Sequence, residues 1–113
     1  MNYELTNDAD YLICALYKYY KEQRKSGKNK SDAKFIGSSE FIFTKLLSEW
    51  TFEDVDETCR ELHRSGLLNC TYADNVVVIS FLEDAAIIYM ENRFKNQLSE
   101  LVAHIAELKS LIF

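Results

Sequence analysis

Two arginines in the stretch TFEDVDETCRELHRSG could read the edges of DNA bases. Arginine donates paired hydrogen bonds to guanine in the major groove, and threonine can add a single contact. Arg60 and Arg64 are four residues apart, so a helix places both on the same face. The candidate base contacts are Thr58, Arg60, His63 and Arg64. This set is typical of a helix that enters the major groove of duplex DNA.

The same stretch carries an excess of acid, which favours a different kind of partner. Its acidic residues outnumber its two arginines, for a net charge of −3, and they are Glu53, Asp54, Asp56, Glu57 and Glu61. A later turn, Ala73-Asp74-Asn75, also lacks a basic side chain. Binding to duplex DNA gains much of its affinity from neutralised phosphates. The acid therefore indicates an alternative, in which this helix binds a basic protein partner.

A basic segment precedes this stretch and could supply the positive charge that DNA binding needs. Residues 18–34 hold seven Lys or Arg against two acids, a net charge of +5, whereas the whole chain has a net charge of −5. We expect Lys25, Lys28 and Lys30 to hold phosphates, on an arm beside the helix-turn-helix. The alternative is a solvated, mobile loop, since the letters SGKNKSDAK contain little that would order them.

Catalytic and metal-binding patterns are missing from the sequence, so we expect no enzyme, no metal and no cofactor. His104 lies between Glu100 and Glu107 at helical spacing, but one imidazole with two surface carboxylates makes a weak metal site. The three cysteines lie within apolar patterns, which indicates buried free thiols rather than nucleophiles. The three glycines are isolated and cannot build a phosphate-binding loop.

The helices that must position these residues follow from caps and apolar periodicity. A first helix is predicted from about residue 8 to Lys25, with apolar residues on nearly every side, which indicates a central position. Ser38 or Ser39 begins a second helix, and Thr51 begins the third, over residues 51–65. The letters KFIG, between the first two helices, fit a short strand.

The period of the apolar residues then changes twice. LLNCTY and VVVISF alternate around the turn ADN, which predicts a β-hairpin. From Glu83 onward the pattern is helical for about 30 residues. Its second half spaces large apolar residues by fours and threes, as a coiled coil does. These residues are Phe94, Leu98, Leu101, Ile105, Leu108 and Ile112.

This order of elements predicts a mainly α fold with a small β-hairpin, namely a winged helix-turn-helix followed by a long C-terminal helix. Residues 1–82 form the winged helix-turn-helix, and residues 83–113 form a C-terminal dimerisation helix packed on the same single domain. A helix of that length extends past so small a core, and its apolar seam would stay in water. We therefore expect a homodimer in which the seams of two chains pack together.

The segment EDVDETCRELHRSGLLNCTYADNVVVISFLEDAAIIYMENRF resembles the small winged-helix proteins of Gram-positive bacteria and their mobile elements. It is most similar to the YjcQ-like group, and its architecture resembles PadR-type repressors, in which the terminal helix dimerises the protein. Over residues 40–113 this resemblance implies a DNA-binding or regulatory role. The leading hypothesis is a small dimeric transcriptional regulator that binds duplex DNA, and the alternative is an interaction module that has lost DNA binding.

The length of 113 residues is that of one domain. No apolar run approaches the roughly 20 residues of a membrane span. The N-terminus MNYELTNDAD lacks the order of a signal peptide. We therefore expect a cytoplasmic protein with no membrane partner.

Overall fold

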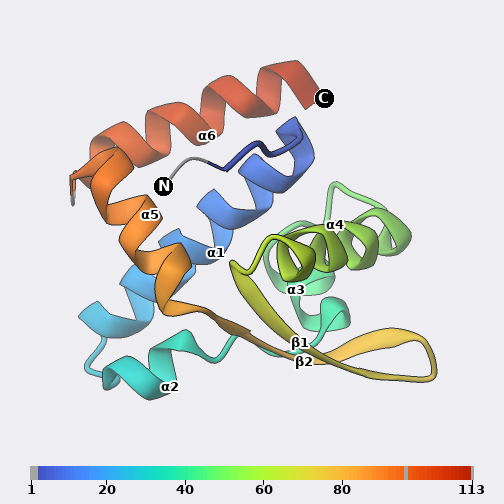
Figure 1. Ribbon diagram of the computed structural model, residues 1–113. Helices are drawn as coiled ribbons and strands as arrows, with labels where there is room; N and C mark the ends of the chain where they lie inside the picture. Colours follow the sequence, from blue (N-terminus) through green and yellow to red (C-terminus); the bar gives the residue numbers. More distant parts are fainter. Residues whose placement is uncertain (1–2, 96, 113) are drawn as a thin grey trace.

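The computed structural model describes residues 3–95 and 97–112 (Figure 1). Their elements are α1 (Asn7–Lys25), α2 (Lys30–Lys34), α3 (Ser39–Lys45), α4 (Phe52–Arg64), β1 (Leu68–Ala73), β2 (Val76–Leu82), α5 (Asp84–Phe94) and α6 (Leu98–Ile112). The fold is therefore mainly α with a small antiparallel hairpin, as the sequence predicts. Among the described helices, none is both long and apolar enough to pass through a bilayer.

α1 is the central helix, and the other helices pack around it. The side chain of Thr6 caps α1 by accepting a hydrogen bond from the backbone N–H of Ala9 at 3.1 Å. Its apolar residues are buried on several sides, because α4, α5 and α6 each pack against it. The nearly all-round apolar pattern of this helix thus correctly predicts its central place.

α3, α4 and the hairpin form the winged helix-turn-helix. Ser38 and Thr51 cap α3 and α4, and each side chain accepts a bond from the backbone N–H three residues later. The turn of the hairpin is Asp74-Asn75, and both residues adopt left-handed backbone, as a type I′ turn requires. At KFIG, where the sequence fits a short strand, the structure has only an isolated bridge between Phe35 and Phe81. This arrangement is that of a winged helix.

The C-terminal segment is two helices, so the expectation of one continuous helix from Glu83 is wrong. Lys95 adopts left-handed backbone, with a φ of 47°, and ends α5. α6 then runs back along α1 in the opposite direction (Figure 1). Leu101 and Leu108 are 1% and 4% exposed, so they fill the core of their own chain. This burial removes the argument that these two leucines need a second chain.

A polar cluster fastens α5 and α6 to α1. The Arg93 guanidinium donates hydrogen bonds to both Asp10 oxygens, at 2.6 and 2.9 Å. His104 Nε2 lies 3.0 Å from Asp10 Oδ2 and 2.6 Å from Arg93 Nη2. Burial raises the pKa of Asp10, but the hydrogen bonds from Arg93 and His104 outweigh burial and hold the pKa below its ordinary value. Asp10 therefore stays ionised and joins helices that are far apart in the sequence.

The segment SGKNKSDAK forms a turn and the short helix α2, whereas the sequence alone gives no reason for it to fold. The backbone N–H of Gly27 donates to the carbonyl of Arg24 at 3.1 Å, which closes the end of α1. A φ of 106° at this glycine allows the chain to turn there. Asn29 then caps the short helix α2 by accepting a bond from the backbone N–H of Asp32 at 2.8 Å. The basic residues of this segment are therefore carried on a defined turn and a short helix.

Candidate interaction surface

Asp56 lies where α4 meets α3 and the hairpin. Its carboxylate accepts hydrogen bonds from Ser39 Oγ at 2.9 Å, from the backbone N–H of Val77 at 2.9 Å and from Arg60 Nε at 3.0 Å. Burial raises the pKa of Asp56, but these hydrogen bonds and the charge of Arg60 outweigh burial and hold the pKa below its ordinary value. The ionised carboxylate of Asp56 thus holds β2 against α3 and α4 by hydrogen bonds.

Arg60 is held against the wing, although the sequence predicts it as a base contact. Besides Asp56, its guanidinium donates to the backbone carbonyl of Asn75 in the turn of the hairpin. It also lies 4.6 Å from the centre of the Tyr72 ring, within the range of a cation–π interaction. The Arg60 side chain is 23% exposed. Three partners in the chain therefore engage the guanidinium that would otherwise reach a base.

The other predicted base contacts differ in their accessibility. Thr58 is 4% exposed and its hydroxyl donates to the carbonyl of Asp54 at 2.6 Å, so the expectation that it contacts bases is wrong. His63 is half-buried, and its Nδ1 lies 2.7 Å from the hydroxyl of Tyr72. Arg64 is exposed and lies 3.5 Å from the carboxylate of Glu57. Of the four predicted side chains, Arg64 is the most accessible.

The accessible side chains around α4 are mostly acidic. We define the acidic surface as Asp8, Glu53, Asp54, Glu57 and Glu61. Glu61 accepts a hydrogen bond from Thr6 Oγ1 at 3.0 Å, which brings α4 against the start of α1. Burial raises the pKa of Asp8, and the negative charges of Asp54 and Glu61 raise it further. Negative charge is therefore concentrated where the sequence predicts a DNA-reading face.

The lysines predicted to hold phosphates lie at and beyond the C-terminal end of α1 (Figure 1). Lys25, Lys28 and Lys30 are all exposed, as a phosphate contact requires. α4 contacts the N-terminal end of α1, through the hydrogen bond between Thr6 and Glu61. Along the α1 axis, residues 8 and 25 are about 26 Å apart. The three lysines therefore lie away from the end of α1 that α4 meets, and their contact with phosphates stays a prediction.

The predicted dimer seam divides into buried and exposed residues. Phe94, Leu101 and Leu108 are buried, and Ile105 and Ile112 are partly buried against the same core. Leu98, by contrast, is 51% exposed. The seam is thus split between the core of this chain and its surface, and a partner could reach only a part of it.

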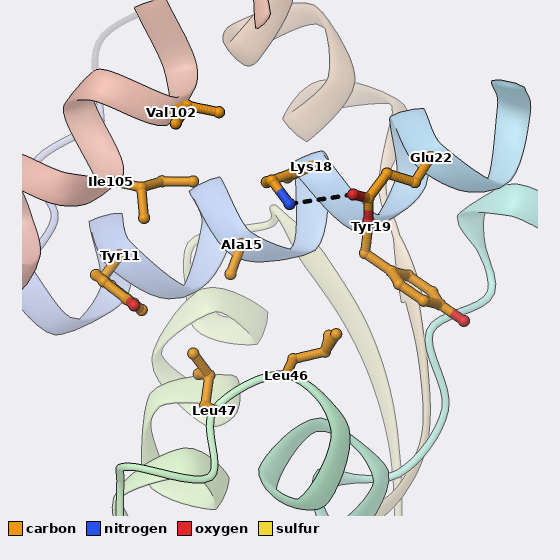
Figure 2. A pocket seen from close by; sticks show the side chains of 9 residues that line it. All are labelled: Tyr11, Ala15, Lys18, Tyr19, Glu22, Leu46, Leu47, Val102 and Ile105. Atoms are coloured by element: carbon orange, nitrogen blue, oxygen red, sulfur yellow. Dashed lines mark hydrogen bonds and ion pairs between the residues drawn. The ribbon is translucent and has the colours of Figure 1, made fainter. Parts of the chain in front are cut away.

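A shallow apolar groove lies between α1, α6 and the end of α3 (Figure 2). Val102 and Ile105 line it from α6, and Leu46-Leu47 lines it from the end of α3. The ion pair Lys18–Glu22, with a distance of 3.0 Å, belongs to its α1 side. Its volume is about 210 Å³, below the usual range of small-molecule sites. The groove therefore suits a side chain of a protein partner better than a whole ligand.

Asp10, Cys14 and His104 are the described residues that could hold a metal ion, with ligand atoms within 4.8 Å of one another. The Arg93 guanidinium already lies among them and bonds to both oxygens of Asp10. Burial raises the pKa of the Cys14 thiol, which disfavours the thiolate that a metal would need. This donor set therefore fits a metal ion poorly, because an internal cation already occupies it.

Sequence reasoning missed the structural role of Asp56 and the partners of Arg60. Asp56 counts among the acids of an exposed face in the sequence, yet it is 8% exposed. Its spacing from Arg60 is that of an ion pair on one helix, a signal that could have been used. Val77 and Asn75 are distant along the chain, however, and helical periodicity carries no information about them.

No family model, no curated protein and no solved structure matches this chain. Function must therefore follow from the chemistry of its own surfaces. Two of them differ sharply in charge: the acidic surface on and beside α4, and the basic turn at the end of α1.

Proposed function

We propose that this chain is a winged-helix interaction module whose acidic surface binds a basic segment of another protein. The observation that carries the proposal is the engagement of Arg60 by Asp56 and the wing. Glu53 and Glu57 remain exposed beside it. The face that a winged helix would present to DNA therefore repels phosphates and attracts Lys and Arg side chains.

The geometry of this surface also supports a specific partner. The hydrogen bonds of Asp56 fix α4 relative to the hairpin, so the carboxylates on α4 are arranged before binding. Glu57 is paired with Arg64, but both side chains are more than 60% exposed, and such pairs are worth little. A basic partner can therefore replace Arg64 at Glu57 at small cost. The partner class is a protein surface rich in Lys and Arg, such as one that itself binds nucleic acid.

Fluorescence polarisation with an array of Lys- and Arg-rich peptides tests this proposal. We expect saturable binding that weakens as salt is added, because exposed charges are screened. The triple variant Glu53→Lys, Asp54→Lys, Glu57→Lys should lose this binding. A matched control reverses three exposed acids of α5 and α6, which are Glu91, Glu100 and Glu107. Equal loss in the two triple variants, or no saturable binding by the wild-type chain, would contradict the proposal.

Duplex DNA binding by a small transcriptional regulator is the second candidate, and the exposed lysines at the end of α1 favour it. In this case Lys25, Lys28 and Lys30 would hold phosphates and Arg64 would contact a base. A mobility-shift assay with random duplexes at low salt measures binding of duplex DNA. Retardation that is lost in Arg64→Ala and kept in Lys45→Ala would support DNA binding by α4. Absence of retardation at micromolar protein would reject it.

We also propose self-association through α6, on a narrower set of residues than the sequence predicts. Leu98 and Val102 are 51% and 45% exposed, and they are one helical turn apart. Val102 lines the apolar groove of Figure 2. Pairing of two α6 helices about a two-fold axis would bury both residues of each chain.

A further inference from the structure

Four basic side chains line one hollow between the end of α1 and the start of α6. They are Lys21, Arg24, Lys25 and Lys28. Leu98 lines the hollow from α6, and the volume is about 570 Å³, which lies within the range of small-ligand sites. The turn that carries Lys28 is fixed, because its backbone N–H donates to the carbonyl of Gln23 at 3.1 Å. The cations are therefore gathered around a defined hollow.

Acids of the described residues form no ion pair with these four cations, although Asp84 and Glu91 line a neighbouring hollow together with Arg24. In the part of the chain that the structure describes, the ion pairs of the basic segment are Lys18–Glu22 and Lys34–Asp84, and the four lining cations form none. Glu22 lines the hollow too, but its carboxylate is engaged by Lys18 at 3.0 Å. The acidic surface is about 26 Å away along α1, several times the screening length of about 8 Å in physiological salt. An external anion is therefore the partner that this charge favours.

A narrow crevice opens beside the hollow and shares Lys21 and Leu98 with it. Tyr17 lines the crevice and is 3% exposed, and its hydroxyl has no hydrogen-bond partner among the described residues. Burial is the main cause that raises the pKa of Tyr17 to about 12, so the hydroxyl keeps its proton. Buried polar groups are nearly always hydrogen-bonded. The crevice holds about 20 Å³, room for about one oxygen or water, so a single acceptor oxygen of a ligand at its mouth could satisfy this donor.

We propose that the hollow binds phosphate groups, supplied either by a small phosphorylated ligand such as a nucleotide or by the backbone of a nucleic acid. Arg24 can donate paired hydrogen bonds to one phosphate, and the three lysines can hold a second as point charges. The hydroxyl of Tyr17 donates to a further ligand oxygen. The site is separate from the acidic surface, so its failure and the failure of the proposed protein interaction are distinguishable.

Isothermal titration calorimetry with three probes tests the site: pyrophosphate, a nucleoside triphosphate and a short random DNA duplex. The test variant is Lys25→Gln with Lys28→Gln, both on exposed side chains, so folding should be unaffected. The control variant is Lys45→Gln with Lys109→Gln, which removes the same charge from exposed positions that do not line the hollow. We expect the test variant to weaken binding roughly tenfold or more and the control to change it little.

The probe that binds identifies the source of the phosphates. Binding of pyrophosphate and the nucleotide, weakened in the test variant alone, indicates a small phosphorylated ligand. Binding of the duplex alone with the same pattern indicates a nucleic-acid backbone. Tyr17→Phe should lower the affinity for the probe that binds. The free protein should stay at least as stable, because the removed hydroxyl has no partner among the described residues. No binding of any probe, or equal weakening in test and control variants, overturns the proposal.

Discussion

At the scale of single residues, Asp56 fixes α4, which carries most of the acidic surface, against α3 and the hairpin. Its carboxylate accepts from Ser39, Arg60 and the backbone of Val77, and it is 8% exposed. Asp56→Ala would leave these donors without their acceptor, so we expect the free energy of unfolding to fall by about 3 kcal/mol. Urea denaturation followed by circular dichroism measures the change.

Glu57→Ala is the control for Asp56→Ala, because it removes a neighbouring carboxylate that is exposed. We expect Glu57→Ala to change the free energy of unfolding by less than about 0.5 kcal/mol. Asp56→Asn should have a free energy of unfolding between those of the two alanine variants. Its amide oxygen can still accept from Val77, but it lacks the charge that holds Arg60. Similar stability of Asp56→Ala and Glu57→Ala would show that the Asp56 contacts do not hold the wing.

At the scale of elements, the docking of α6 on α1 decides how much of the C-terminal segment belongs to the core. Leu101 is 1% exposed and Leu98 is 51% exposed, although they are three residues apart on the same helix. We expect Leu101→Ala to lower the free energy of unfolding by about 2–5 kcal/mol, since it opens a cavity beside α1. Leu98→Ala should cost less than about 0.5 kcal/mol. Urea denaturation at several protein concentrations measures both free energies of unfolding. An equal loss of stability in the two variants would contradict the docking of α6 on α1.

At the scale of the whole molecule, acid should weaken the packing of both halves of the fold. Asp10 and Asp56 have folded-state pKa values below the ordinary 3.8. The stability that these carboxylates contribute is therefore fully present above about pH 4 and is lost as the pH falls through their folded-state values. The pKa of Asp8 is raised in the folded chain, so protonation of Asp8 at low pH adds stability instead of removing it. We expect the free energy of unfolding, measured in urea at stepped pH, to fall on acidification below about pH 4.

The variant Asp10→Asn with Asp56→Asn provides the comparison for this pH dependence. It should be less stable than the wild-type chain at neutral pH, and its stability should change less on further acidification. Asp54→Asn replaces an exposed acid and should keep the pH dependence of the wild-type chain. A double variant with an unchanged loss of stability in acid would show that other groups control acid unfolding.

Assembly is also a property of the whole molecule, and the structure separates the residues that could mediate it. A dimer formed through the exposed side of α6 should be dissociated by Leu98→Lys with Val102→Lys, because both side chains are at the surface and the fold should persist. Leu101→Lys would instead place a charge in the core and unfold the chain. Sedimentation equilibrium with circular dichroism distinguishes these outcomes. A wild-type monomer at tens of micromolar would disprove the dimer.

Several features of this protein could be predicted from the sequence because they depend on neighbours within a few residues. Ser38 and Thr51 cap helices by bonding to backbone three residues later, and the Asp74-Asn75 turn closes a hairpin between two alternating strands. These local signals give α1, α3, α4 and the hairpin in their order, but neither the short helix α2 nor the division of the C-terminal segment into α5 and α6. The acidic character of α4 is likewise a matter of composition.

Only the tertiary structure decided where α6 packs and which charges remain accessible. The spacing of Leu101 and Leu108 requires an apolar surface, but α1 of the same chain and a helix of a second chain satisfy it equally well. The left-handed backbone at Lys95 selects the first solution, and a lysine gives no sequence signal for it. In the same way, Arg60 carries a charge suited to DNA, and its engagement by Asp56 and Asn75 depends on segments that meet only in the fold. Contacts between distant segments depend on how whole elements pack, and residue spacing along one helix cannot specify them.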